Sequence, residues 1–296
     1  MRARLRSPIV LLILPPLFWA GNAIVGKAIV GTVPPLALSF WRWMLAFLVL
    51  LPSALRGVAN HWSDIKREWP LLILLSVLGV GAYNSFQYLA LQSTSAINVT
   101  LIGSALPVVM LPLAVFWLHE RPPWLSYAGV ALSLGGVLMV IARGDAGALL
   151  RLHFAPGDLV MLCAVACWAV YTSLLKRHRP PIPSLPLLTV QVAIGALSIL
   201  PFYLWERTHT GDFALSWQSA GALAYVAVLP SVLAYYCWEK GVAKLGVQLA
   251  GQFVNLTPIF AAILAVLLLG EHFHWYHAGG MALLVGGLWL SNRYRV

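Results

Sequence analysis

The sequence predicts an all-α membrane protein with ten transmembrane helices, arranged as two inverted five-helix repeats. Three observations predict this fold: an apolar composition, ten long apolar runs, and a match between the two halves of the chain. Of the 296 residues, 60% are hydrophobic and only 9% are charged, with a mean hydropathy of +0.84. A soluble domain has about 25% charged residues, so this composition excludes a soluble globular enzyme. The high apolar content also excludes a disordered chain.

Apolar runs long enough to cross a bilayer fill almost the whole sequence. A spanning helix needs about 20 mostly apolar residues. The runs of that kind cover residues 8–30, 35–54, 70–92, 96–118, 123–142, 156–176, 184–204, 216–239, 246–268 and 272–291. They are continuous rather than alternating, which favours helices over the strands of a transmembrane barrel. The first run is too long for a signal peptide and lacks a small-residue cleavage site, so we expect it to be the first spanning helix.

The positive charges predict the orientation. The net charge of +10 comes from 19 Lys and Arg against 9 Asp and Glu. With the N-terminus inside, 14 of these cations fall on cytoplasmic segments and 4 on outer segments, while Arg42 falls within a span. This split follows the positive-inside rule and predicts that both termini are cytoplasmic. The excess charge therefore indicates a lipid bilayer, and not a nucleic acid, as the partner.

The two halves of the chain match at a shift of about 150 residues, which predicts an internal repeat. The matches are Trp19, Lys27 and Pro34 with Trp168, Lys176 and Pro183 at a shift of 149, and Pro107, Glu120 and Trp124 with Pro258, Glu271 and Trp275 at a shift of 151. Each half holds five spans, an odd number, so the second half enters the membrane from the opposite side. We expect repeats at 1–146 and 147–296, an architecture with which secondary transporters bind substrate between the repeats.

Several segments resemble the EamA family of the drug/metabolite transporter superfamily. In the first half they are FWAGNAIVGK at 18–27, the intramembrane Arg42, and the segment from Pro107 to Glu120 that ends in LHE. In the second half they are residues 157–177, LTPIF at 256–260 and LLLGE at 267–271. The resemblance covers almost the full chain. The resemblance implies ten helices, a bacterial inner-membrane location and export of small metabolites. Within the family, the chain is most similar to YddG-type exporters of aromatic and other neutral amino acids.

One position departs from the relatives of this superfamily. Small multidrug-resistance proteins carry a glutamate midway along the first helix, eight residues before a lysine. The corresponding positions here hold Trp19 and Trp168. This departure argues against cation export that is coupled to protons through such a carboxylate.

Arg42 is the one clear charge within a predicted span, about eight residues beyond Pro34 and Pro35. At about 1.5 Å per residue it lies on the order of 12 Å into the membrane. Charged residues at such depth are costly and usually functional. One hypothesis is that Arg42 binds a substrate carboxylate, which arginine holds with two parallel hydrogen bonds. The alternative is a structural arginine bonded to backbone carbonyls or a helix end.

Aromatic and amide side chains within the spans predict a nearly neutral substrate pathway. The expected substrate-binding residues are Trp19, Asn22, Arg42, Tyr83, Gln87, Trp168, Tyr171, Tyr235, Trp238, Gln248, Gln252 and Asn255. Such a cavity suits a neutral amino acid or a similar metabolite, whose ring stacks on side chains while amides bond its polar ends. The alternatives are that polar residues only join helices and that aromatic residues form belts at the membrane surface. For Tyr88, Trp217 and Trp275 we expect the belt.

Proline and glycine mark bends and close contacts. Pro107 and Pro258 lie mid-span at matched positions and are expected hinges, since proline removes a helix hydrogen bond and kinks the helix. Close helix approach, and with it a surface for a homodimer, is expected of six glycines. They are Gly129, Gly135 and Gly136, mirrored by Gly280, Gly286 and Gly287.

The sequence contains few signals for how transport is driven. All nine acids lie in predicted loops or at span ends, and no Walker motif is present. We expect no cofactor or metal, and transport either down the substrate gradient or with weak proton coupling through Glu239 or Glu271. Alternatively, Glu120 and Glu271 cap neighbouring helices. The histidines His272, His274 and His277 lack a nearby acid or cysteine that would complete a metal site.

The leading hypothesis is thus a secondary transporter that works by alternating access, and not an enzyme. The alternatives from the same class are a multidrug or a nucleotide-sugar carrier. Alternatives from other classes are a channel and a membrane-embedded enzyme, which would need convergent polar groups at one depth.

Overall fold

The computed structural model describes residues 8–117, 119, 121–145, 147, 155–178, 180–245 and 253–292. Regular structure in these residues is entirely helical. The α-helices are α1 (Pro8–Ala28), α2 (Pro35–Asn60), α3 (Trp62–Arg67), α4 (Trp69–Ser76), α5 (Tyr83–Ala90), α6 (Ala96–Gly103), α7 (Leu106–Phe116), α8 (Trp124–Ile141), α10 (Pro156–Arg177), α11 (Ser184–Thr210), α12 (Trp217–Val228), α13 (Ala234–Leu245), α15 (Leu256–Leu264) and α16 (Trp275–Asn292). The π-helical segments are η2 (Val77–Ala82), η3 (Leu229–Leu233) and η4 (Ala265–Leu269).

The helices confirm a multi-pass helical membrane protein. Eight helical stretches of the described chain are long and apolar enough to cross a bilayer, and Leu256–Leu269 is a shorter apolar helix. The helix α2 ends at Asn60, beyond the run predicted at 35–54, because polar residues at its C-terminal end continue the helix past the apolar stretch. The short helix α3 then separates it from α4.

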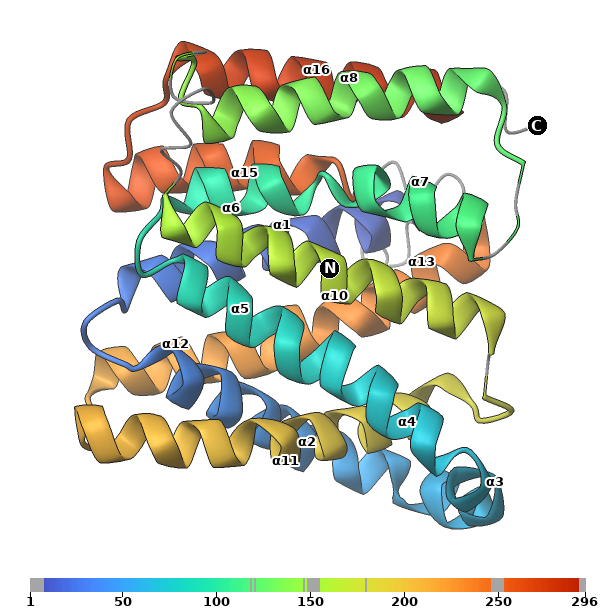
Figure 1. Ribbon diagram of the computed structural model, residues 1–296. Coiled ribbons are helices and arrows are strands. Elements are labelled where there is room, and N and C mark those ends of the chain that lie inside the picture. Colours follow the sequence, from blue (N-terminus) through green and yellow to red (C-terminus); the bar gives the residue numbers. More distant parts are fainter. Residues whose placement is uncertain are drawn as a thin grey trace.

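The helices run side by side across the molecule, and those that begin near the left edge of Figure 1 include α6, α10 and α16. Helix α1 packs on α13 and α15, while α10 packs on α5, α6 and α7. Further large contacts join α2 to α11 and α12, and α8 to α16. Each of these named contacts joins a helix of the first half to a helix of the second.

Helices α8 and α16 pack backbone against backbone along the upper edge of Figure 1. A Cβ added at Gly136 would lie 2.7 Å from the carbonyl oxygen of Gly280, and one added at Gly287 would lie 2.3 Å from that of Gly129. Gly135, by contrast, has no atom within 4 Å of its added Cβ. Gly136 and Gly287 thus leave no room for a side chain, whereas Gly135 faces open space.

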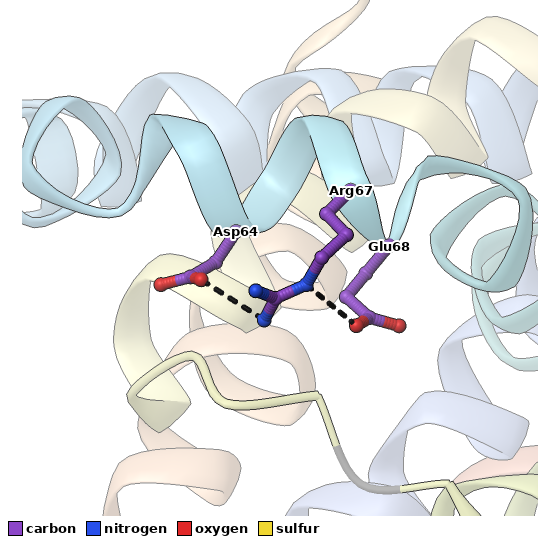
Figure 2. A network of polar contacts seen from close by, with 3 residues as sticks. All are labelled: Asp64, Arg67 and Glu68. Atoms are coloured by element: carbon purple, nitrogen blue, oxygen red, sulfur yellow. Dashed lines mark hydrogen bonds and ion pairs between the residues drawn. The ribbon is translucent and has the colours of Figure 1, made fainter.

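The segment between α2 and α4 rests on one buried side chain and carries its charges outward. Ile65 of α3 is buried and belongs to a small apolar cluster that includes residues of α4 and α11. On the exposed side, Arg67 contacts Asp64 at 3.1 Å and Glu68 at 3.4 Å, as Figure 2 shows. Surface ion pairs of this kind contribute about 0–1 kcal/mol each, so burial of Ile65 anchors α3 and the ion pairs add little.

Two glutamates bridge the halves by capping helices. The carboxylate of Glu206 accepts hydrogen bonds from the backbone N–H groups of Leu36 and Ala37 at 3.1 and 2.8 Å. The carboxylate of Glu271 accepts from those of Ala96 and Ile97 at 2.8 and 3.3 Å. Acids stabilise helix N-termini by satisfying free N–H groups and by opposing the helix dipole. The expected capping role is confirmed for Glu271, whereas Glu120 lies outside the described residues.

Candidate functional site

A cavity of about 160 Å³ lies among helices of both halves of the chain. Its described lining is Trp19, Asn22, Arg42, Tyr83, Asn84, Gln87, Val99, Thr100, Gly103, Ser104, Leu106, Met161, Val165, Trp168, Tyr235, Val254 and Thr257. Arg42 is the only charged member of this lining. The cavity is therefore apolar and aromatic, with amide and hydroxyl groups and one cation.

Two aromatic pairs face the cavity, and each joins the two halves. Tyr83 lies 4.9 Å from Trp168 between ring centroids, and Trp19 lies 6.4 Å from Tyr235 in an edge-to-face arrangement. Trp19 and Trp168 match each other in the internal repeat. Offset and edge-to-face pairs at such distances are favourable by about 0.5–1.5 kcal/mol beyond their buried area. The pairs present ring surfaces against which a flat apolar solute can stack.

Arg42 is 3% exposed and is surrounded by neutral oxygen atoms. Its Nε donates to Ser231 Oγ at 2.7 Å. Its Nη1 lies 3.0 Å from Asn22 Oδ1, 2.6 Å from Asn84 Oδ1 and 2.9 Å from the Tyr88 hydroxyl. Among the described residues no carboxylate contacts this guanidinium, and no hydrogen bond uses its Nη2. These partners are side chains, whereas the structural hypothesis specified backbone carbonyls or a helix end.

The same cluster continues beyond the guanidinium. The Tyr88 hydroxyl donates to Asn22 Oδ1 at 2.6 Å, and Asn22 Nδ2 donates to Gln87 Oε1 at 3.2 Å. The Arg42 guanidinium also lies 4.7 Å from the centroid of the Trp43 ring, within cation–π distance. Tyr88 is 1% exposed, so the prediction that it belongs to an interfacial belt is wrong. Trp217 and Trp275 are exposed, as a belt requires.

The π-helical turn η3 positions groups that contact Arg42 and Trp19. Pro230 lies in η3 and has no backbone N–H, so the carbonyl of Val226 four residues earlier lacks its usual helix donor. The hydroxyl of Ser231 donates to that carbonyl at 2.8 Å and is thereby oriented to accept from Arg42. The carbonyl of Pro230 accepts from Trp19 Nε1 at 3.2 Å. π-turns are frequent at functional sites, and here one turn positions an arginine partner and a cavity tryptophan.

Helix breaks occur just before both expected hinge prolines. The fourth span divides at Ser104 and Ala105, and Pro107 is the second residue of α7. The ninth run turns at Val254 and Asn255, and Pro258 is the third residue of α15. Gly103, Ser104 and Leu106 line the cavity beside the first break, and Val254 and Thr257 line it beside the second.

The cavity brings together most of the expected substrate-binding residues. Those that line it are Trp19, Asn22, Arg42, Tyr83, Gln87, Trp168 and Tyr235. Tyr171 and Trp238 lie behind the lining: Tyr171 packs 5.1 Å from Trp168 and donates to Gln191 at 3.4 Å, and Trp238 packs 5.8 Å from Trp19. Asn255 is the N-cap residue directly before α15 and lies outside the described lining. Gln248 and Gln252 lie outside the described residues.

Sequence reasoning did not select several residues of the site. Asn84 and Tyr88 follow η2 in the third span, and Ser231 lies in the eighth. Their polarity within an apolar run is a usable signal, but only packing shows that all three reach Arg42. In the described part of the chain no group of three His, Cys, Asp or Glu side chains is arranged to hold a metal ion.

The fold and the cavity define a class. A bundle of apolar helices with a buried aromatic cavity, two broken helices beside it and contacts that join matched halves has the features of a secondary transporter. The family model described as the EamA-like transporter family matches residues 6–142 and again residues 155–293. The chain therefore belongs to this transporter family, which is not an enzyme family.

Named relatives extend along most of the chain. An uncharacterized transporter of Archaeoglobus fulgidus is 29% identical over 291 residues, covering 95% of this chain and 96% of that protein. The aromatic amino acid exporter YddG of Ancylobacter novellus is 25% identical over 251 residues, covering 84% of each chain. A solved crystal structure superposes with a TM-score of 0.64 at 22% identity, covering 98% of this chain and 99% of that chain, which shows the shared fold.

Proposed function

We propose that the protein is a secondary transporter of the bacterial inner membrane that exports small neutral metabolites, foremost aromatic and other neutral amino acids. The observation that carries this proposal is the cavity in which paired aromatic rings surround a single buried arginine. An aromatic ring would stack on Trp168 and Tyr83, while the substrate carboxylate would bond Arg42. The similarity to an aromatic amino acid exporter supports the same substrate class.

The size and charge of the cavity favour this substrate class over the other carriers. Pockets for drug-sized ligands have volumes of about 300–1,000 Å³, and this cavity has about 160 Å³. A nucleotide sugar carries phosphate charges and requires several cations, whereas Arg42 alone lines the described cavity. Both observations favour a small solute with one carboxylate.

Alternating access of two inverted repeats is the mechanism we propose. Exchanging the halves maps the contacts of α1 with α13 and α15 onto those of α10 with α5, α6 and α7. The contacts of α2 with α11 and of α8 with α16 map onto themselves. The double match of the family model supports two equivalent units, which we place at 1–146 and 147–296. With cytoplasmic termini, exchange of their shapes would open the cavity to each side in turn.

The helix break before Pro107 yields a testable hinge role. Pro107→Ala is expected to lower flux through proteoliposomes while leaving membrane insertion intact. Proline is less favourable than alanine in a helix interior by about 3 kcal/mol, so alanine would allow α6 and α7 to fuse across Ser104 and Ala105. Pro112→Ala, deeper in α7, is the control and should retain flux. Wild-type flux in Pro107→Ala would refute the hinge role.

Counterflow of labelled amino acids in proteoliposomes tests the proposed function. We expect internal phenylalanine to accelerate uptake of external labelled phenylalanine, because a carrier returns faster when loaded. A channel would show flux without this trans-stimulation, and a protein that does not transport amino acids would show none.

The ring-stacking part of the proposal has its own test in Trp168→Ala. Loss of one aromatic pair of about 0.5–1.5 kcal/mol should raise the half-saturation concentration for phenylalanine roughly two- to twelvefold. The effect on alanine transport should be smaller because alanine has no ring. Trp205→Ala is the control, since Trp205 is exposed on α11 outside the described cavity lining. Equal effects on phenylalanine and alanine would contradict ring stacking.

A further inference from the structure

A buried carboxyl group lies close to the cavity but is not part of its lining. Asp158 is the third residue of α10 and is 0% exposed. Its Oδ1 accepts a hydrogen bond from Thr94 Oγ1 at 2.6 Å, while its Oδ2 has no hydrogen-bond partner in the described structure. An ionised carboxylate buried with a free oxygen loses its hydration without replacement, and binding a proton removes that cost. The expectation that the acids lie at span ends was correct for Asp158 in sequence, but it did not anticipate this burial.

A directed chain of hydrogen bonds joins this carboxyl group to a histidine. The backbone N–H of His274 donates to His277 Nδ1 at 3.1 Å, so in this arrangement the imidazole is neutral and carries its proton on Nε2. Nε2 lies 3.2 Å from Asn98 Oδ1, which accepts its proton. Asn98 Nδ2 then donates to Thr94 Oγ1 at 3.3 Å, and Thr94 donates to Asp158. Every donor in the chain points toward the carboxylate.

The chain of hydrogen bonds from His277 to Asp158 lies at one end of the molecule. Thr94 follows α5, Asn98 lies in the first turn of α6, and Asp158 and His277 lie in the first turns of α10 and α16. These helix starts lie at the left of Figure 1, which is the outer end if both termini are cytoplasmic. Glu271 caps α6 at the same end. The hydrogen bonds therefore hold together the outer ends of three helices.

The same helices lead to the cavity. On α10, Met161 and Val165 line the cavity one and two turns beyond Asp158. On α6, Val99 lines it directly after Asn98. A movement of the outer ends of α6 and α10 would therefore also move residues that line the cavity, because both sets of residues lie on the same continuous helices.

Charged and titratable groups from several neighbouring elements lie around these hydrogen bonds. Arg143, after α8, interacts electrostatically with Asp158, and Tyr276 of α16 does so as well. Lys27 of α1 donates to the carbonyls of Leu91 and Thr94, both at 2.8 Å. His274 faces His277, and Glu271 is engaged by the N-terminus of α6. Of these cations, Arg143 favours the ionised carboxylate of Asp158, and burial opposes that charge.

Resting on the proposed function, we propose that Asp158 and His277 form a proton-binding site that makes opening of the outer end, and with it transport, depend on the pH outside. The proton adds to the free Oδ2 of Asp158. A proton added to His277 Nδ1 would remove the acceptor of the His274 N–H and loosen the first turn of α16 from α6. Proton uptake at the outer end thereby favours its opening, and proton release restores the closed bonds.

Asp158→Asn in full-length protein tests this dependence on pH. The change is nearly isosteric and keeps an oxygen that can accept from Thr94, so we expect folding and counterflow close to wild type. The dependence of counterflow on the external pH should be lost, and His277→Gln should weaken it. Asp145→Asn is the matched control, because Asp145 is an exposed acid that follows α8. It should retain counterflow and its dependence on the external pH.

The outcomes separate this inference from the proposed function. Counterflow in the wild type without any response to the external pH would overturn the proton site and leave the transporter proposal intact. A folded Asp158→Asn protein that loses counterflow would also overturn it, because the residue would then be structural. Infrared spectroscopy gives a readout that needs no substrate: a titrating band of a protonated carboxyl group should be present in the wild type and absent in Asp158→Asn. Identical spectra would overturn the site.

Discussion

Replacing Arg42 by glutamine is expected to abolish most transport of amino acids while leaving uptake of the corresponding amines much less affected. The guanidinium is the one charge on the described cavity lining. A hydrogen bond to a charged group contributes about 1.5–3 kcal/mol, so loss of one such bond to a carboxylate should raise the half-saturation concentration on the order of tenfold to a hundredfold. Competition by phenylalanine and by phenylethylamine, which lacks the carboxylate, provides the comparison.

The control for Arg42→Gln must separate substrate binding from folding. Ser231→Ala removes the partner of Arg42 Nε without changing a residue of the described lining. If Arg42 acts on substrate, Ser231→Ala should be mildly impaired and should still prefer phenylalanine over phenylethylamine. Thermal unfolding and size-exclusion profiles establish that each variant is folded. An Arg42→Gln protein that is folded and still discriminates between these two compounds would contradict carboxylate binding.

Gly136→Leu is expected to destabilise the protein severely, whereas Gly135→Leu at the adjacent position should be tolerated. Overpacking a well-filled interface costs about 1–3 kcal/mol, and the Cβ alone at Gly136 would lie 2.7 Å from a backbone oxygen of Gly280. That oxygen cannot move aside without moving α16. At Gly135 the same side chain enters open space and gains roughly 1 kcal/mol of helix propensity over glycine.

Thermal unfolding in detergent measures this difference between adjacent positions. We expect a lower melting temperature and poor recovery for Gly136→Leu, and a melting temperature equal to or above that of the wild type for Gly135→Leu. Both variants add the same side chain to the same helix, so they change the hydrophobicity of the span, and its tendency to insert into the membrane, equally. Equal losses in the two variants would show that the contact of α8 with α16 does not limit stability.

The sequence predicted features that depend on composition and on spacing along one helix. The lengths of the apolar runs predicted the helices, and the depth of Arg42 beyond Pro34 predicted a buried cation. The matched tryptophans Trp19 and Trp168 predicted one aromatic contribution from each half, and both line the cavity. These properties are local, because a helix rises by a fixed distance per residue.

Features that depend on contacts between distant helices could not be predicted. Tyr88 has the composition of an interfacial aromatic residue, and only the packing of α5 on α2 brings its hydroxyl to Arg42. Asp158 lies near the start of α10, and its burial arises where the end of α5 and the segment after it pack against that start. Ser231 is one of many serines in apolar runs, and its role arises from the neighbouring proline.

The π-turn η2 also changes which residues of the third span share a face. With an unbroken turn of about 100° per residue, Asn84 would lie roughly 120° around the helix from Leu72. The extra residue of a π-turn removes about 100° of that angle, so both residues are buried on nearly the same side. The third span is therefore two helical segments out of phase by one residue. Deleting a single residue within η2 would remove that extra residue and restore an α-helical turn, so the amides of α5 would stay on this face; converting η2 to an α-helical turn without a deletion would turn them away from Arg42 by about 100°.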